Sequence, residues 1–405
     1  MVIIAGQNYG SILTMARDLG EAGYAVCVIR VFKKAPGRLN ILGGMTPERE
    51  SRYVTDYKQV VLNGDPGAFL SCLEALADPS RKQVLLCVDD FLVAIVDDNY
   101  DRLAPFFHLS NINEEAGAVT RLMDKDKQKQ LAARCGLPVL RSTIATTNAD
   151  GVMIPGDTPY PCFVKPLISM QGAKKTMARC DSEAELEGLL QQLSGGKEGR
   201  FLAEQYINLK DEYAALGISL PGLVWIPGAF RYIRSGHRER TGVAVTGRIE
   251  THPALPEVLN ACKEFVTALQ YHGIFDIDLL ESEEGNLYFI EINFRSGAST
   301  HVFSAAGANL PAAFADYATK GTLPDMTKYE ANRTAVFVSE KALLEEYVHS
   351  DVSGKEIAQA QAEANVPFIR DTADPAPYVY FQKYMKRAKW LRLPYKVLDR
   401  LRQKR

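Results

Sequence analysis

The sequence predicts a multidomain protein of α/β and α+β class, in which a parallel-sheet N-terminal domain precedes further units that become rich in strands. Its length of 405 residues is about two to three times that of a typical domain. Short apolar runs alternate with helical periodicity through residues 1–115, and the pattern becomes rich in strands after Phe201. Alternation of strands and helices is typical of a parallel sheet, whereas successive strands are typical of an antiparallel one.

The first part of the chain contains the elements of a covered parallel sheet. Apolar, β-branched runs predict strands at residues 2–5, 25–31, 60–62 and 84–88, and apolar residues at helical spacing predict helices at 12–22 and 70–76. Because these strands are apolar on both faces, we expect helices on both sides of the sheet.

The rest of the chain divides where its texture changes. We expect a helix at 122–136, a strand at 162–165, a helix at 182–193, a long helix at 256–271 and a hairpin of strands 275–280 and 286–292. The predicted units are an N-terminal domain at 1–115, a first lobe at 116–200, a second lobe at 201–320, a C-terminal region at 321–382 and a basic tail at 383–405.

Composition excludes several classes of protein. With 46% hydrophobic and 24% charged residues, the chain is neither disordered nor fibrous. The net charge of −2 gives no reason to expect a nucleic-acid partner. This value hides an asymmetry, because residues 383–405 hold ten Lys and Arg against one acid, which gives +9 there and −11 elsewhere.

The cysteines and the N-terminus bear on the cellular location. The seven cysteines are odd in number and never stand in C-x-x-C spacing, so neither a disulfide framework nor a zinc site is indicated. The sequence opens on an apolar strand without a charged leader, and it has no apolar run of about 18 residues. We therefore expect a cytoplasmic protein.

The hairpin carries the most informative polar residues. Side chains two apart on a strand share a face, so Glu291, Asn293 and Arg295 point the same way, as do Asp276 and Asp278 on the partner strand. Carboxylate and amide oxygens at this density suit a hard cation such as Mg²⁺. The alternative is an ordinary solvent-exposed face, but Glu291 and Asn293 interrupt an apolar run, where an unpaired polar group is costly.

This segment resembles the metal-binding signature of the ATP-grasp ligases, in which a strand bearing an acid or amide precedes the sequence E-x-N-P-R. Three upstream segments occur in the order that this family requires. They are 123–125 before Gly136 and Pro138, the strand 163–166, and the segment 202–207. The resemblance implies a two-lobed ATP-grasp fold that follows an N-terminal pre-ATP-grasp domain, with ATP and Mg²⁺ or Mn²⁺ as cofactors.

The resemblance also implies roles for individual residues. Lys125 and Lys165 would bind the ATP phosphates as compact charges. Glu204 would accept the adenine amino group and the backbone of Gln205, Tyr206 and Ile207 would meet the adenine edge. The ribose hydroxyls would bind Glu212, with Asp211 as the alternative.

The sequence departs from the family pattern in two places. The loop expected to cover the phosphates has a single glycine, Gly172, so Ser169 and Lys174 would replace backbone donors. Phe294 stands where proline is usual, which would change the turn without removing a ligand. The metal ligands would be Glu291, Asn293 and one of Asp276 and Asp278, with Asp278 favoured.

Other residues are candidates for contact with the substrates. Arg295 is the expected catalytic residue, because it could stabilise an acyl phosphate or the γ-phosphate in transit. Three arginines could clasp a carboxylate or diphosphate, although a solvated loop is the alternative, and these are Arg231, Arg234 and Arg240. Asp90, at the end of a strand, could meet an amino group or cap a helix, and His301 could contact a substrate or be an ordinary polar residue.

Within the family, the likeness is greatest to the D-aspartate ligases. The expected function is therefore an ATP-dependent ligase that activates a carboxylate as an acyl phosphate and couples it to an amine, both of them small molecules. The alternatives are a carboxy-phosphate or carbamoyl-phosphate-forming enzyme, which shares the same core, and a nucleotide-binding module without turnover.

The basic tail allows two interpretations. Its ten cations and interspersed aromatic and aliphatic residues suit contact with an anionic membrane at its inner face. The alternative is a helix packed on the acidic body of the protein. A homodimer is also compatible with the resemblance.

Overall fold

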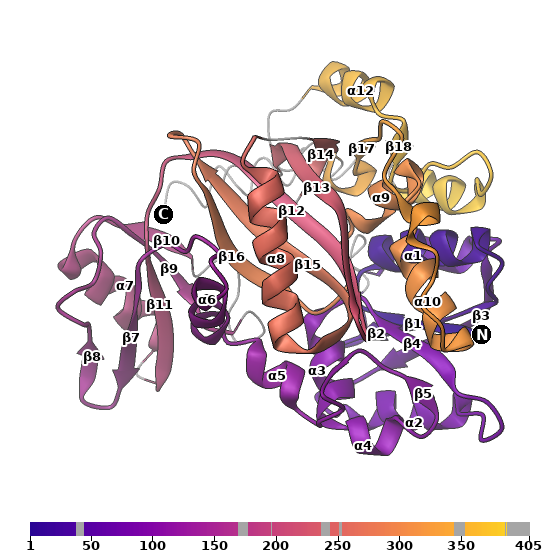
Figure 1. Ribbon diagram of the computed structural model, residues 1–405, viewed down its shortest axis with the longest axis horizontal. Coiled ribbons are helices and arrows are strands. Elements are labelled where there is room, and N and C mark those ends of the chain that lie inside the picture. Colours follow the sequence, from indigo (N-terminus) through magenta and orange to yellow (C-terminus); the bar gives the residue numbers. More distant parts are fainter. Residues whose placement is uncertain are drawn as a thin grey trace.

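The computed structural model describes residues 1–37, 44–168, 177–195, 197–235, 244–250, 253–343, 353–384 and 386. Within these residues the chain forms three sheets, each built mainly from consecutive parts of the sequence (Figure 1). The first sheet is parallel and the other two are largely antiparallel, which confirms the predicted α/β and α+β class.

The N-terminal domain is built on a parallel sheet with strand order β3-β2-β1-β4-β5. Helix α1 covers one face and helices α2 and α3 cover the other, so apolar side chains on both faces are buried. The predicted covered sheet is therefore confirmed. Its elements are β1 (Val2–Gly6), α1 (Tyr9–Glu21), β2 (Val26–Phe32), η1 (Pro47–Glu50), β3 (Val54–Val61), α2 (Gly67–Leu76), β4 (Gln83–Cys87), α3 (Asp90–Asp98), α4 (Tyr100–Leu103) and β5 (Phe107–His108).

The first lobe is an antiparallel sheet with strand order β10-β9-β11-β7-β8, and helix α7 packs on it. The predicted boundary at residues 200 and 201 falls inside β11. The elements of this lobe are α6 (Lys125–Arg134), β7 (Ser142–Asn148), β8 (Gly151–Met153), β9 (Cys162–Pro166), β10 (Ala178–Cys180), α7 (Glu183–Ser194) and β11 (Gly199–Gln205).

The helix predicted at 122–136 is present as α6, Lys125–Arg134, but the predicted start is wrong. Helix α5 (Ala118–Leu122) ends before Asp124 and helix α6 begins after it. The Asp124 carboxylate accepts hydrogen bonds from the backbone N–H groups of Asp126 and Lys127, so it caps a new helix. This break places Lys125 in the first turn of α6.

The second lobe is a larger sheet with strand order β16-β15-β12-β13-β14-β17-β18. Helix α8 packs on one face, whereas α9 and α10 pack on the other and join the core around α1. Strand β6 (Asn111–Ile112) pairs with β15 and so ties the N-terminal domain to this lobe. The elements are β12 (Leu209–Leu220), β13 (Leu223–Ser235), β14 (Ala244–Glu250), α8 (Leu255–Leu269), β15 (Tyr271–Ser282), β16 (Leu287–Asn293), α9 (Thr300–Ala306), α10 (Leu310–Lys320), η4 (Met326–Tyr329) and β17 (Val336–Val338).

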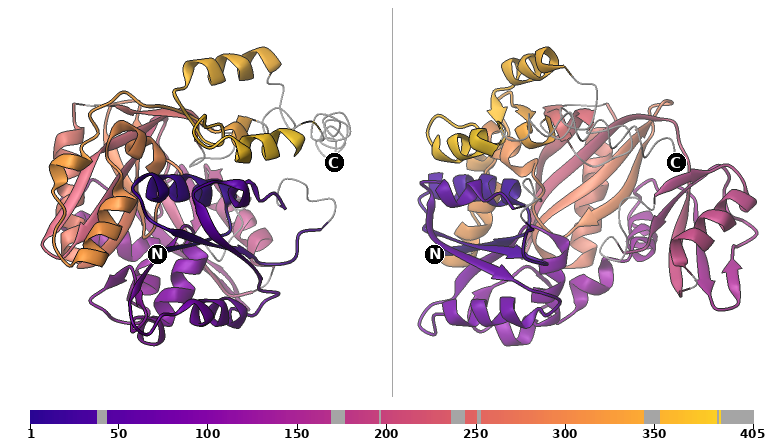
Figure 2. Two further views of the ribbon diagram at one scale, coloured as in Figure 1. Left: turned by 90° about the vertical axis from the view of Figure 1, so that its right-hand side faces the viewer. Right: turned by 180° about the vertical axis from the view of Figure 1, so that it is seen from behind.

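The C-terminal region, from β17 onward with α12 (Gly354–Glu363) and β18 (Val366–Pro367), lies beside α1 (Figure 2). Arg17 of α1 is fully buried and joins the two parts. Its guanidinium donates to the Asp374 carboxylate at 3.0 Å and to the backbone carbonyls of Phe368 and Ile369.

Arg17→Met is expected to lower the free energy of unfolding by about 3 kcal/mol, because it leaves a buried carboxylate without its cation. Asp374 is only 1% exposed. Urea denaturation of the full chain measures the change. Arg52→Met is the matched control, since that side chain bonds Ala373 at the surface, and it should cost less than about 1 kcal/mol. Equal losses in the two variants would contradict a structural role for the buried pair.

Among the described residues, no helix is long and apolar enough to cross a membrane. Of the basic tail, residues 385 and 387–405 lie outside the described part of the chain, so its predicted membrane contact stays a prediction.

Candidate active site

The hairpin of β15 and β16 carries the acidic residues that the sequence singles out. Asp276 lies opposite Asn293, and Asp278 lies opposite Glu291. Directly opposed residues of an antiparallel pair share a face of the sheet, so the four side chains project together. A bulge follows the Asp278 pair and shifts the register of the strands beyond it.

Hydrogen bonds link these side chains to Arg295. The Asn293 amide donates to Asp278 at 3.2 Å, and its oxygen accepts from Arg295 at 3.1 Å. Arg295 also bonds Asp90, at 3.1 Å, and lies 3.8 Å from Asp276. Burial lowers the pKa of Arg295, but the carboxylates of Asp90, Asp276 and Asp278 outweigh it and raise the value. Arg295 thus remains charged at the centre of an acidic group.

Asp276 is the most deeply buried member of this group, at 5% exposure. Burial and the neighbouring Asp278 carboxylate raise the pKa of Asp276 to about 8, although Arg295 acts in the opposite direction. Its Oδ1 atom has no hydrogen-bond partner among the described residues. A buried carboxylate oxygen of this kind is a position where a cation would be favourable.

Lys125 reaches this acidic group from the first lobe. It is 3% exposed, and its ammonium forms an ion pair with Glu291. Burial and the nearby Lys165 ammonium lower the pKa of Lys125 to about 7, whereas Asp278 and Asp90 favour its charged form. Lys125 and Glu291 therefore neutralise each other across the two lobes.

Lys165, at the end of β9, belongs to a second buried ion cluster. Glu204 of β11 accepts from Lys165 at 2.7 Å through one carboxylate oxygen and from Lys129 at 2.5 Å through the other. Lys129 also donates to the Leu140 carbonyl at 2.7 Å. Burial alone would raise the pKa of Glu204, but the two lysines lower it below its usual value. The cluster carries a net positive charge.

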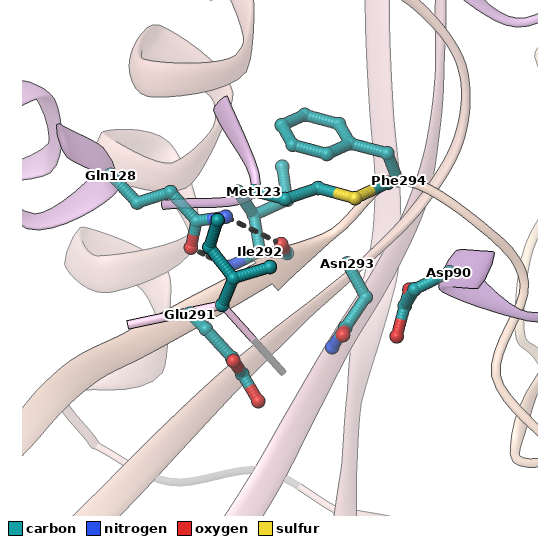
Figure 3. Close-up of a pocket in the computed structure, with 8 residues that line it drawn as sticks. Asp90, Met123, Gln128, Glu291, Ile292, Asn293 and Phe294 are labelled. Carbon is teal, nitrogen blue, oxygen red and sulfur yellow. Dashed lines mark hydrogen bonds between the residues drawn. The ribbon is translucent and has the colours of Figure 1, made fainter. Parts of the chain in front are cut away.

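The Gln128 side chain of α6 forms hydrogen bonds with the backbone of β16, the strand that carries Glu291 and Asn293 (dashed lines in Figure 3). Its amide donates to the Ile292 carbonyl at 3.1 Å and accepts from the Ile292 N–H at 3.0 Å. Ile292 stands between Glu291 and Asn293. Gln128 therefore sets the position of both side chains relative to the lysines of α6. Asp90, Gln128, Glu291 and Asn293 line one small pocket (Figure 3).

The segment between the two lobes borders a larger cavity of about 480 Å³. Gln205, Tyr206 and Ile207 line one side, and Tyr288 and Asn286 of the hairpin line the other. The Arg179 guanidinium lies 4.5 Å from the centre of the Tyr206 ring. A cavity of this size matches a small-molecule site.

The sequence is similar, at low identity, to those of curated enzymes. No family model matches the sequence. The chain is 27% identical over 187 residues to the formate-dependent phosphoribosylglycinamide formyltransferase of Bacillus subtilis, which covers 44% of this chain and 47% of that protein. It is 24% identical over 297 residues to the D-alanine–D-alanine ligase of Pseudomonas entomophila, which covers 66% of this chain and 86% of the ligase. The chain therefore spans about half the length of the formyltransferase it matches.

Solved structures share the architecture. Biotin carboxylase from Campylobacter jejuni, solved as a β-γ-ATP complex, aligns with a TM-score of 0.63 at 16% identity, over 82% of this chain and 74% of the carboxylase. An L-amino acid ligase from Bacillus licheniformis aligns with a TM-score of 0.58 at 16% identity, over 83% and 80%. The chain has the ATP-grasp fold. The two-lobed fold predicted from the sequence is thereby confirmed.

The ATP-grasp lobes bring most of the predicted nucleotide residues together. Glu212 is buried, at 6% exposure. It stands two residues before Ala214 on β12, and Ala214 lies opposite Asp278, so Glu212 faces the same side of the sheet as Asp278. Asp211 faces the other side and binds Arg231 at 2.8 Å. Of the two acids considered for the ribose, Glu212 is thus the one on the face of Asp278, and its role stays a prediction. Ser169 and Lys174 lie outside the described residues.

Several predicted substrate residues lie elsewhere. Arg231 pairs in register with Tyr213, on the opposite face of the sheet from Asp278, so the expectation that it joins this site is wrong. His301 pairs with Asp18 of α1 at 2.6 Å. Burial lowers the pKa of His301, but the Asp18 carboxylate raises it above its usual value. Arg240 and the side chain of Arg234 lie outside the described part of the chain.

The two acids that end β4 have different roles. Asp89 caps α3 by accepting from the Leu92 N–H, and it also accepts two hydrogen bonds from Gln7. Asp90 turns to the pocket and binds Arg295. The helix cap is therefore Asp89 and not Asp90, and the contact of Asp90 with an amino group stays a prediction.

Sequence reasoning missed three residues of the ATP-grasp site. Lys129 follows Lys125 by four positions, which on a helix places both on one face, so its spacing was an available signal. Gln128 acts through the backbone of a distant strand, which spacing cannot show. Tyr232 of β13 lies close enough to Asp276 and Asp278 that their charges, after burial itself, raise its pKa.

The donor set fits a divalent cation. Among the described residues no three His, Cys, Asp or Glu side chains form a metal cluster. Mg²⁺ needs no such cluster, because it uses one or two carboxylates together with water and phosphate oxygens. Asp278, Glu291 and the Asn293 oxygen supply this kind of set, with the unpartnered Asp276 oxygen beside it.

Lys129→Met is expected to raise the KM for ATP about tenfold, equivalent to about 1.4 kcal/mol, with a smaller change in kcat. Without Lys129, both Glu204 oxygens become available to Lys165, which would then be less able to bind phosphate. Steady-state kinetics at saturating co-substrates measure the effect. Lys127→Met on the exposed side of α6 is the matched control, and an equal KM in the two variants would contradict the role of Lys129.

Proposed function

We propose that this protein is an ATP-dependent ligase that activates a carboxylate as an acyl phosphate and couples it to an amine. The observation that carries the proposal is the ion pair between buried Lys125 of the first lobe and Glu291 in the acidic group of the second, with the buried Lys165–Glu204 pair in the first lobe. The similarity to a D-alanine–D-alanine ligase and to an L-amino acid ligase supports it.

The nucleotide would lie between the lobes. The cavity beside Gln205, Tyr206 and Ile207 would take the adenine, and Glu212 would bind the ribose hydroxyls. Lys125 and Lys165 would face the phosphates, since both are buried cations, Lys125 paired with Glu291 of β16 and Lys165 with Glu204 of β11, and their charges act on each other. In the absence of nucleotide these two lysines are neutralised by Glu291 and Glu204, and phosphate oxygens would take over that role.

Asp278, Glu291 and Asn293 would hold Mg²⁺ or Mn²⁺, which when bound neutralises charge on the phosphate oxygens. Asp278 is preferred to Asp276 because its carboxylate lies directly opposite Glu291 and within hydrogen-bond distance of Asn293. Asp276 instead faces Arg295, which it would help to orient.

The reaction requires charge stabilisation more than covalent catalysis. The substrate carboxylate would attack the γ-phosphorus and release ADP, and the amine would then attack the acyl carbon and release phosphate. Arg295 is held at the site by Asp90 and Asn293, so its guanidinium would stabilise the negative charge that develops in both steps. Asp90 is the acid best placed to accept a hydrogen bond from an incoming ammonium group.

The finer assignments belong to this proposal as well. The likeness of the sequence to D-aspartate ligases suggests an amino acid as the amine. If the basic tail contacts an anionic membrane, the acceptor would be presented there. Removal of residues 383–405 would then abolish co-sedimentation with anionic vesicles.

A carboxy-phosphate-forming activity is the second candidate, because the biotin carboxylase gives the higher TM-score of the two structures above. That enzyme class would use bicarbonate in place of an organic carboxylate.

The proposal is tested by a screen for release of ADP and phosphate from Mg-ATP with pairs of amines and carboxylates, and with bicarbonate. Release that requires both an amine and an organic carboxylate is expected. Bicarbonate-dependent release would favour the second candidate. Nucleotide binding without release under any condition would indicate a module without turnover and contradict the proposal.

A further inference from the structure

The carboxyl edge of the N-terminal sheet carries polar residues outside the nucleotide site. In the strand order β3-β2-β1-β4-β5, the chain passes outward from β1 through β2 to β3 and then returns to the other side of β1 for β4 and β5. The direction of strand addition thus reverses between β1 and β4, which is called a topological switch point. Ligands of open parallel sheets bind at the carboxyl ends of the strands beside such a point. Gln7, Arg30 and Asp89 stand at this edge, on or just after β1, β2 and β4 respectively.

Arg30 is the unusual residue of this edge. It is 2% exposed, and neither its Nε nor its Nη1 atom has a hydrogen-bond partner among the described residues. Its nearest carboxylate oxygen, on Glu48, is 3.5 Å from Nε, and its guanidinium lies 4.7 Å from the centre of the Phe32 ring. Buried guanidinium donors are seldom left unbonded, because the cost of removing them from water is not recovered.

Glu48 forms an ion pair with Arg30, but the acids near Arg30 leave its Nε and Nη1 donors without a hydrogen bond among the described residues. Glu48 is fully buried, and burial raises its pKa to about 7 although Arg30 lowers it. Its Oε2 atom is also without a partner among the residues the structure describes. The Asp89 carboxylate already accepts three hydrogen bonds, from the Gln7 backbone, the Gln7 side chain and the Leu92 backbone.

Besides the carboxylates of Glu48 and Asp89, two sources of positive potential lie near Arg30. Arg30 shares the α1 face of the sheet with Val26 and Val28, and it is close enough to Tyr9, the first residue of α1, to interact with it electrostatically. The N-terminus of α1, a helix of 13 residues, therefore points its positive end toward this region. Lys341 lies over the Tyr9 ring, 5.6 Å from its centre, and adds a further cation.

We propose that Arg30 anchors an oxyanion-binding subsite in the N-terminal domain, which takes a carboxylate or phosphate group through the unpartnered Nε and Nη1 donors. Glu48 would accept a hydrogen bond from a donor on the same ligand through Oε2. Anion binding itself is independent of the proposed ligase activity, whereas the assignment of this anion to a substrate rests on that activity.

The subsite lies on the same edge of the sheet as the active site. Gln7 binds Asp89, and the next residue, Asp90, binds Arg295. A substrate held by Arg30 would therefore extend from the N-terminal domain toward Asp90. This arrangement would select small substrates that carry a second anionic group in addition to the reacting one.

Titration of the full chain with inorganic phosphate or succinate, at constant ionic strength and without nucleotide, tests the proposal. Isothermal calorimetry gives the dissociation constant. In Arg30→Met the constant for the better anion should rise at least tenfold, and in Arg49→Met, which removes an exposed arginine of the neighbouring η1, it should stay within twofold of the unsubstituted protein. The better anion also shows whether the subsite takes phosphate or carboxylate.

A second pair of variants guards against misfolding, since Arg30→Met leaves Glu48 buried without its cation. Glu48→Gln should retain anion binding, and Glu48→Gln combined with Arg30→Met should lose it at an unchanged circular dichroism spectrum. The two variants share an intact nucleotide site, so phosphate bound to Lys125 or Lys165 cancels in the comparison. Equal affinities in this pair, or no binding by the unsubstituted protein, would overturn the proposal.

Discussion

Arg295→Met is expected to lower kcat/KM for ATP-dependent amide formation about 10³-fold, because it removes a charge that acts where the transition state is most negative. The arginine is held by Asp90 at 3.1 Å and by Asn293 at 3.1 Å, so in the proposed reaction it would need no reorganisation when the acyl phosphate forms. Coupled detection of ADP under saturating ATP measures the loss.

A second variant separates the effect of the positive charge of Arg295 from that of its planar donor geometry. Arg295→Lys keeps a cation beside Asp90, Asp276 and Asp278 and so protects the fold, but it loses the planar set of donors. We expect a decrease of about 10- to 100-fold for this variant. Arg102→Met, at the surface on α4, is the control and should leave activity unchanged. Arg295→Met that retains more than a tenth of the activity would contradict a catalytic role.

Glu291→Gln is expected to reduce activity at least about 100-fold, since it replaces a proposed metal ligand and not merely a neighbour of one. The substitution preserves shape and removes the charge. Because a metal ligand is lost, the concentration of Mg²⁺ needed for half-maximal activity should rise. The substitution also removes the carboxylate charge that pairs with the buried Lys125. Activity measured across a Mg²⁺ titration separates this effect from a loss of folded protein.

The same hairpin provides the control for this experiment. Glu284, in the turn between β15 and β16, lines the larger cavity and lies away from the register pairs of Asp276 and Asp278. Glu284→Gln makes the same chemical change and should leave the Mg²⁺ dependence unaltered. If both variants required the same Mg²⁺ concentration as the unsubstituted protein, Glu291 would not be a metal ligand.

Local periodicity explains why so much of the fold could be predicted. Strands β1, β2 and β4 of the N-terminal domain are largely apolar runs, and the hairpin alternates polar with apolar residues, so these elements follow from short stretches of sequence. Strand β3 is mostly polar, and only its end was predicted. The break between α5 and α6 was missed because it depends on which of several polar residues caps a helix. Asp124 caps α6 only because the backbone leaves the helical conformation between Leu122 and Lys125.

The site was predictable where it lies along one strand and less so where it is formed by packing. Glu291, Asn293 and Arg295 share a face by spacing alone, as do Asp276 and Asp278. Arg231 was assigned wrongly because its direction depends on its register with Tyr213, and the sequence does not specify that register. The roles of Lys129 and Gln128 depend on contacts with residues 75 and 164 positions away.

The charge distribution also has a structural interpretation. Outside the tail the chain is acidic, yet the first lobe buries Lys125, Lys129 and Lys165 close to one another. Lys125 pairs with Glu291, and Lys129 and Lys165 share Glu204, so the three cations are balanced by two carboxylates. A polyphosphate would compete for these cations, which is how an acidic protein can bind a highly charged anion.

The central claim, that a carboxylate is activated as an acyl phosphate, is tested most directly by isotope transfer. The carboxylate substrate found in the screen is labelled with ¹⁸O, and the inorganic phosphate formed with amine and Mg-ATP is analysed by mass spectrometry. Attack of the carboxylate on the γ-phosphorus, followed by cleavage of the acyl C–O bond, predicts one ¹⁸O atom in each phosphate released. Phosphate without ¹⁸O, formed at the same rate as the amide, would contradict the account.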